Sequence, residues 1–516
     1  MTFEDEKESV RQAGWTYLVA THLGTAFLFV LFLVLGRQAG SLDFDRFLAA
    51  AGAVSPVAGV AFLLALIGFG TKAGFMPLHV WLPEAHPAAP SPVSALMSAV
   101  MLKTAVYGLL RVTFDLLDIQ LWWWGALALS VGLLSALFGV LFAAVQTDIK
   151  RLLAYSSIEN IGIITVAFGL TILFKAFHME LLAAVAFTAM LYHALNHTLF
   201  KALLFLGTGS VLHATGSRSF GKLGGLIHRM PWVAALCLVG MLAASGLPPL
   251  NGFVSEWLLL QSFLLTPGLP HSYLNMLVPV AAAALVLAGA LAAYVMVKFY
   301  GVIFLGRPRE AKLTEAHDAS WWERAGLAWL ALLCLLLGLL PLSVIDAIDH
   351  VSASLIGARL GPVASQSGWL LLTPLSPARA SYSPIIFLAV TLLVTLGSYL
   401  LVHKYFRRST RRADAWDCGY PLQTSRMQDT AEGFGQPISE IFEPAFEIKR
   451  IVPDPADTHP IYRKRQTDRS WRWLYLPIAR IVEVLSDLVG RLQHGRIQWY
   501  LFYSFATLLV LLIFVR

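Results

Sequence analysis

Three side chains that can carry protons recur at helical spacing in the run LYHALNHTLFKALLFLG. His193, His197 and Lys201 lie at i, i+4 and i+8, and a turn of ~100° per residue places all three on one helix face. Two histidines at i, i+4 could also bind zinc, but no third ligand follows at a suitable spacing and Lys201 would repel a cation. Imidazole titrates near neutral pH, so this row favours proton transfer.

Four more ionisable residues lie inside apolar runs or at their ends. Lys72 follows closely spaced glycines, and Lys103 lies in the middle of PVSALMSAVMLKTAVYGLL. Glu159 and Glu256 add two carboxylates. A charged lysine in hydrocarbon costs several kcal/mol, so we expect these groups to face one another across a hydrated interior. Two structural alternatives stay open: Lys72 could extend to the membrane surface, and the acids and lysines could form fixed ion pairs.

The composition indicates which elements position these residues. Of 516 residues, 57% are hydrophobic and only 13% are charged, whereas a soluble domain carries roughly a quarter charged residues. A helix needs about 20 apolar residues to cross a bilayer, and such runs recur along the chain. We therefore expect an all-α fold, a polytopic transmembrane bundle of about 11 helices. The net charge of +7 is expected to reflect basic cytoplasmic loops, not nucleic-acid binding.

Two of the expected spans are broken helices. Gly74 and Pro77 interrupt one near Lys72, and Gly246 and Pro249 interrupt another just before Glu256. If each broken segment crosses once, most loop Lys and Arg residues fall on one side, which predicts a cytoplasmic N-terminus and a cytoplasmic stretch 404–496. The expected spans are 15–36, 54–75, 92–114, 122–145, 153–175, 181–212, 233–265, 276–303, 325–345, 384–404 and 497–515.

A few residues are expected to have other roles. Arg111 and Lys298 lie near the ends of spans and are expected to extend toward the membrane surface. The cysteines Cys237, Cys334 and Cys418 are far apart, which suggests neither a disulfide framework nor an iron-sulfur cluster. Any redox chemistry would then belong to partner subunits.

Five parts are expected along the chain. The tail shows no helical period before residue 470, and its segment 473–492 has the pattern of an amphipathic helix that would lie along the membrane or against a neighbour. The parts are a polar N-terminus (1–14), a proton-translocation domain (15–345), a loop with an additional span (346–404), the basic cytoplasmic stretch with its amphipathic helix (405–496) and a last span (497–516).

One family resembles this chain in four motifs: GTKAGFMPLHVWLPEAHPAAPSPVSALMSAVMLKTAVYGLLR, DIKRLLAYSSIENIG, HALNHTLFKALLFLGTGSV and SGLPPLNGFVSEWLLL. They are similar to the antiporter-like proton-translocating subunits of NADH-quinone oxidoreductase, cation/proton antiporter complexes and membrane-bound hydrogenases. The resemblance covers about residues 15–345. In the tail, WDCGY and RMQDTAEGFGQPISEIFEP resemble the hydrogenase-4 and formate hydrogenlyase branch of this family.

The resemblance implies a role for each candidate site residue. The family usually has about five further helices ahead of the segment that matches 15–36, so the first of its two inverted repeats would be incomplete here. The implied matches are Lys72 to the lysine of the broken seventh helix, Lys103 to a relay position in the eighth, Glu159 to the tenth helix, His193, His197 and Lys201 to the relay of the eleventh, and Glu256 to the exit residue of the broken twelfth.

The implied function is that of a proton-translocating membrane subunit of a multisubunit oxidoreductase, of the membrane-bound hydrogenase or formate hydrogenlyase type. This chain would hold no cofactor, and iron-sulfur clusters and a nickel-iron centre would belong to partner subunits. Its partners would be other membrane and peripheral subunits and the lipid of a prokaryotic cytoplasmic (inner) membrane. Two alternatives stay open: a cation/proton antiporter subunit driven by an ion gradient, and a non-transporting membrane scaffold.

Overall fold

Every one of the eleven expected spans contains a helix in the computed structural model of the protein. Eight described helices are long and apolar enough to cross a membrane, and three shorter apolar helices account for the other spans. The chain is thus an all-α, multi-pass membrane protein, as its composition predicts. The structure describes residues 4–50, 56–118, 121–264, 269–377, 380–406, 419–420, 424–454, 456–460, 463–469, 472, 475–491 and 495–514.

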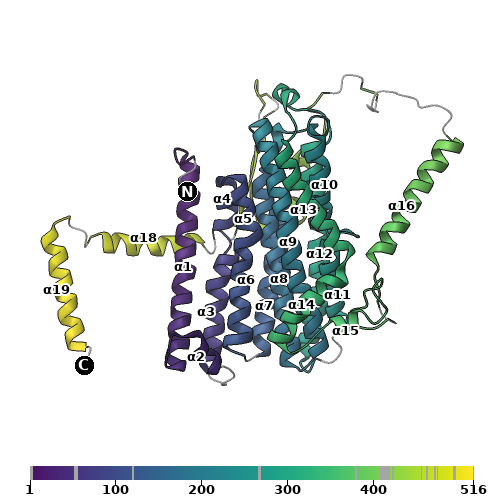
Figure 1. The fold of residues 1–516 in the computed structure, drawn as a ribbon. Helices are drawn as coiled ribbons and strands as arrows, with labels where there is room; N and C mark the ends of the chain where they lie inside the picture. Colours follow the sequence, from purple (N-terminus) through teal and green to yellow (C-terminus); the bar gives the residue numbers. More distant parts are fainter. Residues whose placement is uncertain are drawn as a thin grey trace. The chain divides into compact units, whose positions relative to one another are not determined.

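The chain divides into two units, 1–436 and 437–516. The first unit holds the bundle of helices in Figure 1. Its longest elements are α1 (Glu8–Ala39), α7 (Trp122–Val145), α8 (Ile149–Ala176), α9 (Glu180–Thr215), α12 (Ser272–Phe304), α13 (Trp321–Leu339) and α16 (Pro384–Leu401). Shorter elements are α2 (Phe44–Ala49), α14 (Pro341–Ile356), α15 (Gly361–Ala364), the 3₁₀ turns η3 (Phe220–Lys222), η4 (Leu226–His228) and η5 (Ala311–Glu315), and the π turn η6 (Val402–Phe406).

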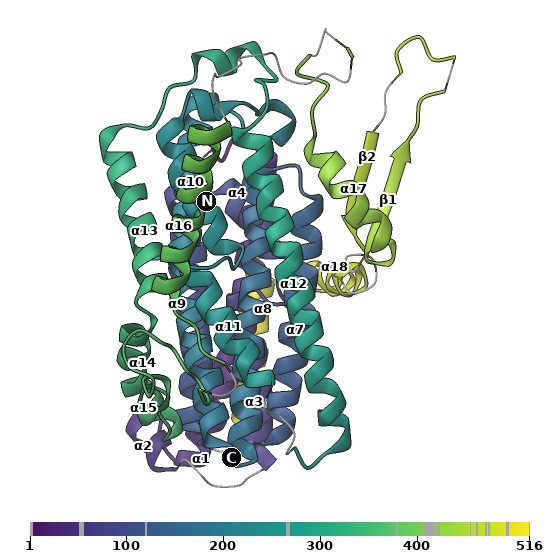
Figure 2. The same cartoon turned by 90° about the vertical axis from the view of Figure 1, so that its right-hand side faces the viewer.

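The first predicted break lies between α3 (Pro56–Ala73) and α4 (Trp81–Ala88). Gly74 has a positive φ of 77°, a conformation that glycine adopts without strain and that ends α3. The freed Thr71 carbonyl accepts a hydrogen bond from the Trp81 indole at 2.7 Å. In Figures 1 and 2, α3 and α4 lie one beyond the other along the bundle, so the broken segment crosses once.

The second predicted break lies between α10 (Pro231–Ala244) and α11 (Asn251–Phe263). Gly246 has a φ of 61°, and the following prolines Pro248 and Pro249 cannot donate helical hydrogen bonds. Figures 1 and 2 again place the two halves one beyond the other. Both interruptions are therefore confirmed as discontinuous helices.

A third break was not expected. The span 325–345 is divided into α13 and α14, with Leu340 between them. Pro341 begins α14 and has no backbone N–H, so the carbonyl of Leu337, four residues earlier, loses its helical partner. The sequence did not predict this break because Pro341 lies inside an apolar run, near the end of the expected span.

Wide π turns interrupt the helix that carries Lys103. This segment runs through α5 (Ser91–Leu96), the π turn η1 (Met97–Met101), α6 (Leu102–Leu110) and the π turn η2 (Arg111–Leu116). A π turn disturbs the regular i→i+4 ladder, so nearby carbonyls become available to side chains, and such turns are frequent at functional sites. Lys103 lies directly after the first of them.

Glycines bring α7 and α8 into close contact. Gly125, Gly132 and Gly139 recur every seven residues along α7 and face α8. A Cβ added at Gly132 would lie 2.6 Å from the backbone N of Val166 and 2.8 Å from the carbonyl O of Gly162. Only glycine permits this approach of the two backbones. The resulting pair fixes the rotation of α8, whose side chains are almost all buried.

The tail contains a helix that we did not expect before residue 470. Helix α17 (Ala431–Ile441) carries Gly and Pro inside it. The strap, residues 424–436, packs on the first unit: the Gln428 side chain exchanges two hydrogen bonds with the backbone of Arg307, at 2.8 and 2.9 Å. Tyr294 donates to the Phe434 carbonyl at 2.7 Å. This docking explains a helix that local periodicity alone did not predict.

The second unit contains two antiparallel strands and two helices. Strands β1 (Phe446–Ile451) and β2 (Arg463–Asp468) pair with Phe446 opposite Asp468, after the turn η7 (Glu443–Ala445). Helix α18 (Leu476–Gly490) falls inside the expected amphipathic segment 473–492, and α19 (Ile497–Phe514) falls inside the last expected span. The first three residues of the WDCGY motif, of which Cys418 is the third, lie outside the described residues.

Candidate functional site

The seven predicted site residues lie on five segments of the first unit. The three residues of the row are on α9, and each of the others has its own helix. The placements are Lys72 on α3, Lys103 on α6, Glu159 on α8, His193, His197 and Lys201 on α9, and Glu256 on α11.

Helix α9 carries its three proton carriers in the interior of the bundle. His193, His197 and Lys201 are at most 1% exposed. Helix α9 packs against α5, α8, α10, α11 and α13, so residues four apart on one face meet different neighbouring helices. The expected one-face arrangement is present, and its burial means that each polar group needs a partner inside the protein.

Lys103 and His197 are hydrogen bonded to each other, Nζ to Nδ1. The Lys103 Nζ also donates to the carbonyl of Ser98 at 2.6 Å, in the π turn just before it. The next carbonyl of that turn, on Ala99, accepts from the Thr198 hydroxyl at 2.8 Å. The π turn thus orients Lys103 toward α9 and links the two helices.

His193 connects α9 to α8 and α11. Its Nδ1 lies 3.0 Å from the Ser255 hydroxyl and its Nε2 lies 3.1 Å from Oδ1 of Asn160. Asn196 donates to the Ser255 hydroxyl at 3.0 Å and to the Asn251 carbonyl at 2.7 Å. Both ring nitrogens of His193 are therefore engaged, and the histidine is held between the first turns of α11 and the middle of α8.

Sequence reasoning did not select Asn160, Asn196, Ser255 or Asn251. A signal was available for two of them, because Asn160 follows Glu159 directly and Ser255 precedes Glu256 directly. Neutral polar side chains inside apolar runs are common, and which of them meet a histidine depends on helix register. The structure supplies that register.

Lys201 and Glu159 are two fully buried side chains of the site that become charged on gaining or losing a proton. The Lys201 Nζ donates to the Leu153 carbonyl at 3.2 Å, and a Glu159 carboxylate oxygen accepts from the Ser156 hydroxyl at 3.2 Å. The Glu159 carboxylate lies close enough to Lys201 and Glu256 to interact electrostatically with both. No ion pair within 4.0 Å joins these groups among the described residues. Lys201, Glu159 and Glu256 therefore do not form the fixed ion pair that the structural alternative requires.

Glu256 lies at the second break. A Cβ added at Gly246 would lie 2.5 Å from its Oε2, and one added at Gly289 on α12 would lie 3.8 Å away. Its carboxylate makes no hydrogen bond with any described residue. Glycines on both sides therefore leave room for an acid whose partner is a proton or water.

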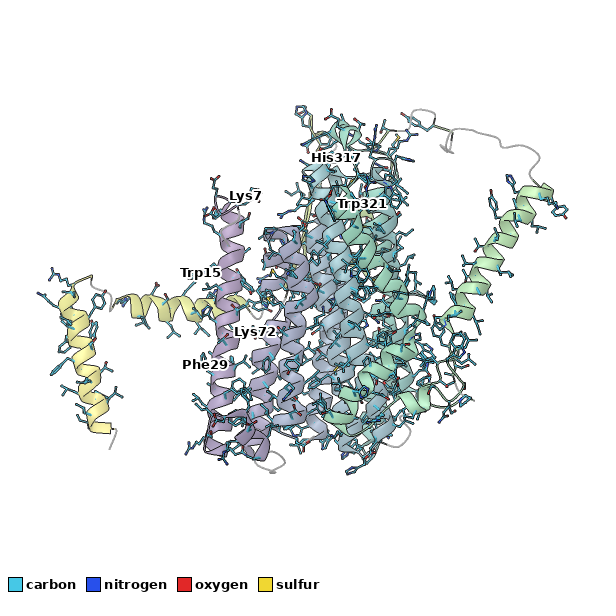
Figure 3. The ribbon with its side chains drawn as sticks, viewed as in Figure 1. Lys7, Trp15, Phe29, Lys72, His317 and Trp321 are labelled. Atoms are coloured by element: carbon cyan, nitrogen blue, oxygen red, sulfur yellow. The ribbon has the colours of Figure 1, made fainter. Side chains whose placement is uncertain are left out.

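Lys72 stands apart from the other six residues. It is half-buried and makes no hydrogen bond or ion pair with the described residues. Figure 3 shows it beside α1, at a height between Trp15 and Phe29. Helix α1 packs on α3, and Gly24 lets it approach Gly68 closely. The structure therefore does not join Lys72 to Lys103.

Buried polar atoms without a partner lie along the row on α9. They are Nε2 of His197, Oδ1 of Asn196 and Nδ2 of Asn251, together with Nε2 of His86 on α4. Buried polar groups in folded proteins bond to protein or to internal water. These four atoms therefore indicate water sites between α4, α9 and the start of α11.

A large cavity approaches this region from the end of the bundle that carries the N-terminus. It has a volume of about 790 Å³ and is lined by Lys7, Lys150, Arg218 and the segment 87–92. That segment follows His86 directly. The His86 ring interacts electrostatically with Lys150, Lys103 and Lys201. His86, which sequence reasoning did not select, has its ring centroid 5.5 Å from that of Phe205 on α9 and directly precedes the segment that lines the cavity.

Arg111 and Lys298 differ from each other. Arg111 pairs with Asp115 near the end of its segment and is largely exposed, as expected of a side chain that extends toward the surface. Lys298 is fully buried and donates to the carbonyls of Ala144 and Gln146 at 2.7 Å each. The expectation that Lys298 extends to the surface is wrong, because the unpaired carbonyls at the end of α7 hold its ammonium.

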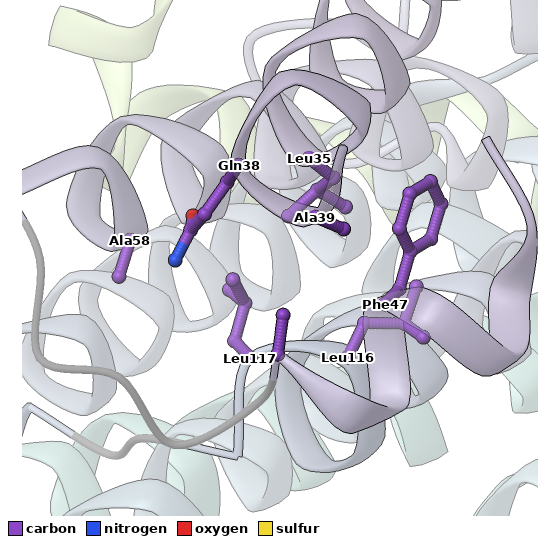
Figure 4. A pocket seen from close by; sticks show the side chains of 8 residues that line it. Leu35, Gln38, Ala39, Phe47, Ala58, Leu116 and Leu117 are labelled. Carbon is purple, nitrogen blue, oxygen red and sulfur yellow. The ribbon is translucent and has the colours of Figure 1, made fainter. Parts of the chain in front are cut away.

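Two further features bear on what the described residues could bind: the grouping of metal-ligating side chains and a second cavity. Among the described residues, no group of three His, Cys, Asp or Glu could hold a metal ion. Figure 4 shows a small cavity, of about 20 Å³, between α1, α2 and η2. Its lining is apolar apart from Gln38, so it contributes nothing to proton chemistry.

Comparisons with known proteins identify the family of the chain. The family described as "NADH:quinone oxidoreductase/Mrp antiporter, TM" matches residues 1–269. Hydrogenase-4 component B of Escherichia coli is 38% identical over 98% of this chain and 76% of its own length. Formate hydrogenlyase subunit 3 of the same organism is 36% identical over 85% of this chain and 69% of its own. A chain of the archaeal membrane-bound sulfane sulfur reductase superposes with a TM-score of 0.73 at 25% identity, over 98% of this chain and 76% of that one.

Proposed function

Since the chain belongs to the NADH:quinone oxidoreductase/Mrp antiporter transmembrane family, we propose that it translocates protons as a membrane subunit of a multisubunit oxidoreductase of the hydrogenase type. Its similarity to hydrogenase-4 component B extends over nearly the whole chain, tail included. The observation that carries the proposal is a pair of hydrogen bonds on one face of α9 inside the bundle, one between Lys103 and His197 and the other between His193 and Ser255. A scaffold would have no need of so many buried protonatable groups.

Protons reach the row on α9 from the cavity beside His86. The cavity is lined by Lys150 and Arg218, and His86 lies within electrostatic range of Lys150, Lys103 and Lys201. Water at the unpaired Nε2 of His86 supplies the hydrogen-bonded link. On this route His86 is the first side chain of the relay that a proton from the cavity reaches.

Transfer along the row uses the hydrogen bond between Lys103 and His197. Lys103 gives a proton from Nζ to Nδ1 of His197 and is left neutral, and His197 releases its other proton from Nε2 to water. Asn196 and Asn251 hold that water next to His193, and Glu256 at the break of α10–α11 accepts the proton. The charges of Lys201 and Glu159 change with the number of protons that the row on α9 holds.

Energy for the transport comes from electron transfer in partner subunits. Moving one charge against the membrane potential costs about 2.3 kcal/mol per 100 mV. We assign iron-sulfur clusters and a nickel-iron centre to those partners, and to this chain only the proton path. Since no described contact joins Lys72 to the row on α9, a neighbouring subunit would act through the charge of Lys72 by electrostatic influence at a distance.

The orientation follows from the basic loops, with the N-terminus and residues 404–496 in the cytoplasm of a prokaryotic cell. Labelling of single cysteines in intact cells with an impermeant maleimide tests it. Lys312→Cys should be protected and Asp45→Cys should react, since both positions are exposed at opposite ends of the bundle. Native Cys237 and Cys334 are buried, and Cys418 is replaced by serine beforehand. The reverse labelling pattern would show that the N-terminus and residues 404–496 face the opposite side of the membrane.

The first experiment is purification of the tagged protein from its native membranes in mild detergent, with mass spectrometry of the co-purified subunits. Iron-sulfur and nickel proteins are expected. Only small antiporter subunits in the eluate would favour the second candidate, a gradient-driven antiporter subunit, which the family name also includes.

The second experiment measures proton uptake by inverted membrane vesicles during turnover with the complex's own electron donor. Lys201→Ala should assemble normally and abolish uptake, because it removes a buried proton carrier from the row. Lys312→Ala, an exposed cation, is the matched control and should behave as wild type. Normal uptake by Lys201→Ala in an assembled complex would refute transport and leave the scaffold.

A further inference from the structure

The segment between α15 and α16 packs over α11 at the end of the bundle opposite the N-terminus. Tyr382 and Leu372 hold this segment in place by a pair of backbone hydrogen bonds, at 2.9 and 3.0 Å. Leu372 is buried, and Ser383 caps the first turn of α16. Tyr382 is therefore fixed in position by its own backbone.

The Tyr382 ring rests on the face of α11 that carries Phe253 and Trp257. The ring centroids lie 5.0 Å from Phe253 and 5.6 Å from Trp257, and these two residues flank Glu256 in the sequence. The Tyr382 hydroxyl is buried and has no hydrogen-bond partner among the described residues. An aromatic ring packed for shape alone would not need a hydroxyl in such a place, since burying one without a partner is costly.

Tyr192 presents a second hydroxyl to the same region from α9. It directly precedes His193, is fully buried, and donates to the Leu337 carbonyl. That carbonyl is available only because Pro341 cannot donate to it. The Tyr192 and Tyr382 phenols lie close enough to interact electrostatically. Tyr192 directly precedes His193 on α9, and the Tyr382 ring packs on α11, so one tyrosine belongs to, and the other packs on, the pair of helices that a hydrogen bond of His193 joins.

A cavity lies at the break between α13 and α14. It has a volume of about 100 Å³ and is lined by Leu340, Pro341 and Ser343 at the break of α13–α14, and by Leu372 and Pro384 on either side of Tyr382 in the chain. A water molecule occupies about 30 Å³ of liquid, so several could fit. The cavity is connected to the two tyrosines through its walls. Leu372 is the backbone partner of Tyr382. The break at Pro341 frees the Leu337 carbonyl to which Tyr192 donates.

We propose that Tyr382 is the outlet residue of the proton path, which passes a proton from water shared with Tyr192 to the cavity at the α13–α14 break. The inference rests on the proposed function. In each transfer the Tyr382 oxygen accepts a proton from the inner water and releases its own hydroxyl proton to the outer water, so the phenol is regenerated and no other group is consumed.

The electrostatics of Tyr382 are compatible with this step. Burial raises the pKa of the Tyr382 hydroxyl to about 12, so it stays protonated at neutral pH. A neutral phenol can donate one hydrogen bond and accept others, which a relay between two waters requires.

The test compares Tyr382→Phe with Tyr382→Ala in the intact complex, in vesicles that turn over with its own electron donor. The phenylalanine keeps the ring on Phe253 and Trp257 and removes only the hydroxyl. If the hydroxyl carries the proton, both variants should lower the rate of proton translocation about tenfold, a barrier increase of ~1.4 kcal/mol. Tyr273→Phe, a partly exposed tyrosine at the start of α12, is the matched control and should pump normally.

Normal pumping by Tyr382→Phe would overturn the proposal, whether Tyr382→Ala is normal, defective or unassembled, because it would show that the ring alone matters. Lys201→Ala in the same series separates this outcome from a failure of the proposed function. If Lys201→Ala stops pumping while Tyr382→Phe does not, only the outlet assignment fails. If Lys201→Ala pumps normally, the proton path itself fails.

Discussion

Lys103 and His197 are 94 residues apart in the chain, yet the Nζ of one bonds the Nδ1 of the other in the interior of the bundle. The π turn before Lys103 and the packing of α9 on that turn bring them together. A lysine amine and an imidazole in direct contact cannot both be protonated without strong repulsion between their positive charges. This pair is therefore well suited to hold one mobile proton.

Removing either member of this pair should have the same effect as removing both. Lys103→Gln and His197→Gln should each lower proton translocation at least about tenfold, and the double variant should lose little more, because the two residues act as one step. Proton uptake by vesicles is the measurement. Additive losses in the double variant would show that the two residues work on separate routes.

Glu256 should require a carboxyl group rather than a particular shape. Glu256→Gln keeps the volume and cannot bind and release a proton, so uptake should be lost, whereas Glu256→Asp should retain part of it. The space that Gly246 and Gly289 leave around the carboxylate allows the shorter acid to be accommodated. Equal activity of the two variants would remove Glu256 from the path.

The contact between α7 and α8 should tolerate no added methyl group. Gly132→Ala would place Cβ 2.6 Å from the backbone of Val166, and overpacking of this kind costs about 1–3 kcal/mol. The protein should lose thermal stability in detergent, measured as the fraction that stays monodisperse after heating. Gly301→Ala on α12 meets nothing within 4 Å and is the control. An unchanged melting profile for Gly132→Ala would contradict the close approach of the two helices.

Lys298 should matter for stability and not for proton transfer. Lys298→Met removes the donor from two buried carbonyls at the end of α7, and each unpaired group costs about 1–3 kcal/mol. The melting temperature in detergent should fall, while the exposed Lys312→Met should melt as wild type. A stable Lys298→Met variant with impaired proton uptake would move Lys298 into the transport path.

The strap should be released by the loss of one side chain. Gln428→Ala removes two hydrogen bonds to the backbone of Arg307, worth about 1 kcal/mol each. Trypsin cleavage after the exposed Arg426 should then become about tenfold faster or more. Gel analysis of a digestion series measures the rate. An equal rate for both proteins would mean that the strap is held by other contacts.

The sequence by itself determined the class of fold, the two glycine- and proline-rich breaks and the row on α9. Each of these depends on local order: apolar run length, residues that cannot continue a helix, and a spacing of four residues on one helix. The break at Pro341 and the helix α17 were missed, because one lies inside an apolar run and the other is stabilised by docking on the distant helix α12.

Only the tertiary structure decided which polar groups meet. His193 could have faced many partners, and its contacts with Asn160 and Ser255 follow from the rotation and register of α8 and α11. That rotation is set by glycine contacts and by carbonyls freed at π turns and prolines, which act between segments far apart in the chain. Periodicity fixes which side of a helix is polar, but packing fixes which neighbour that side faces.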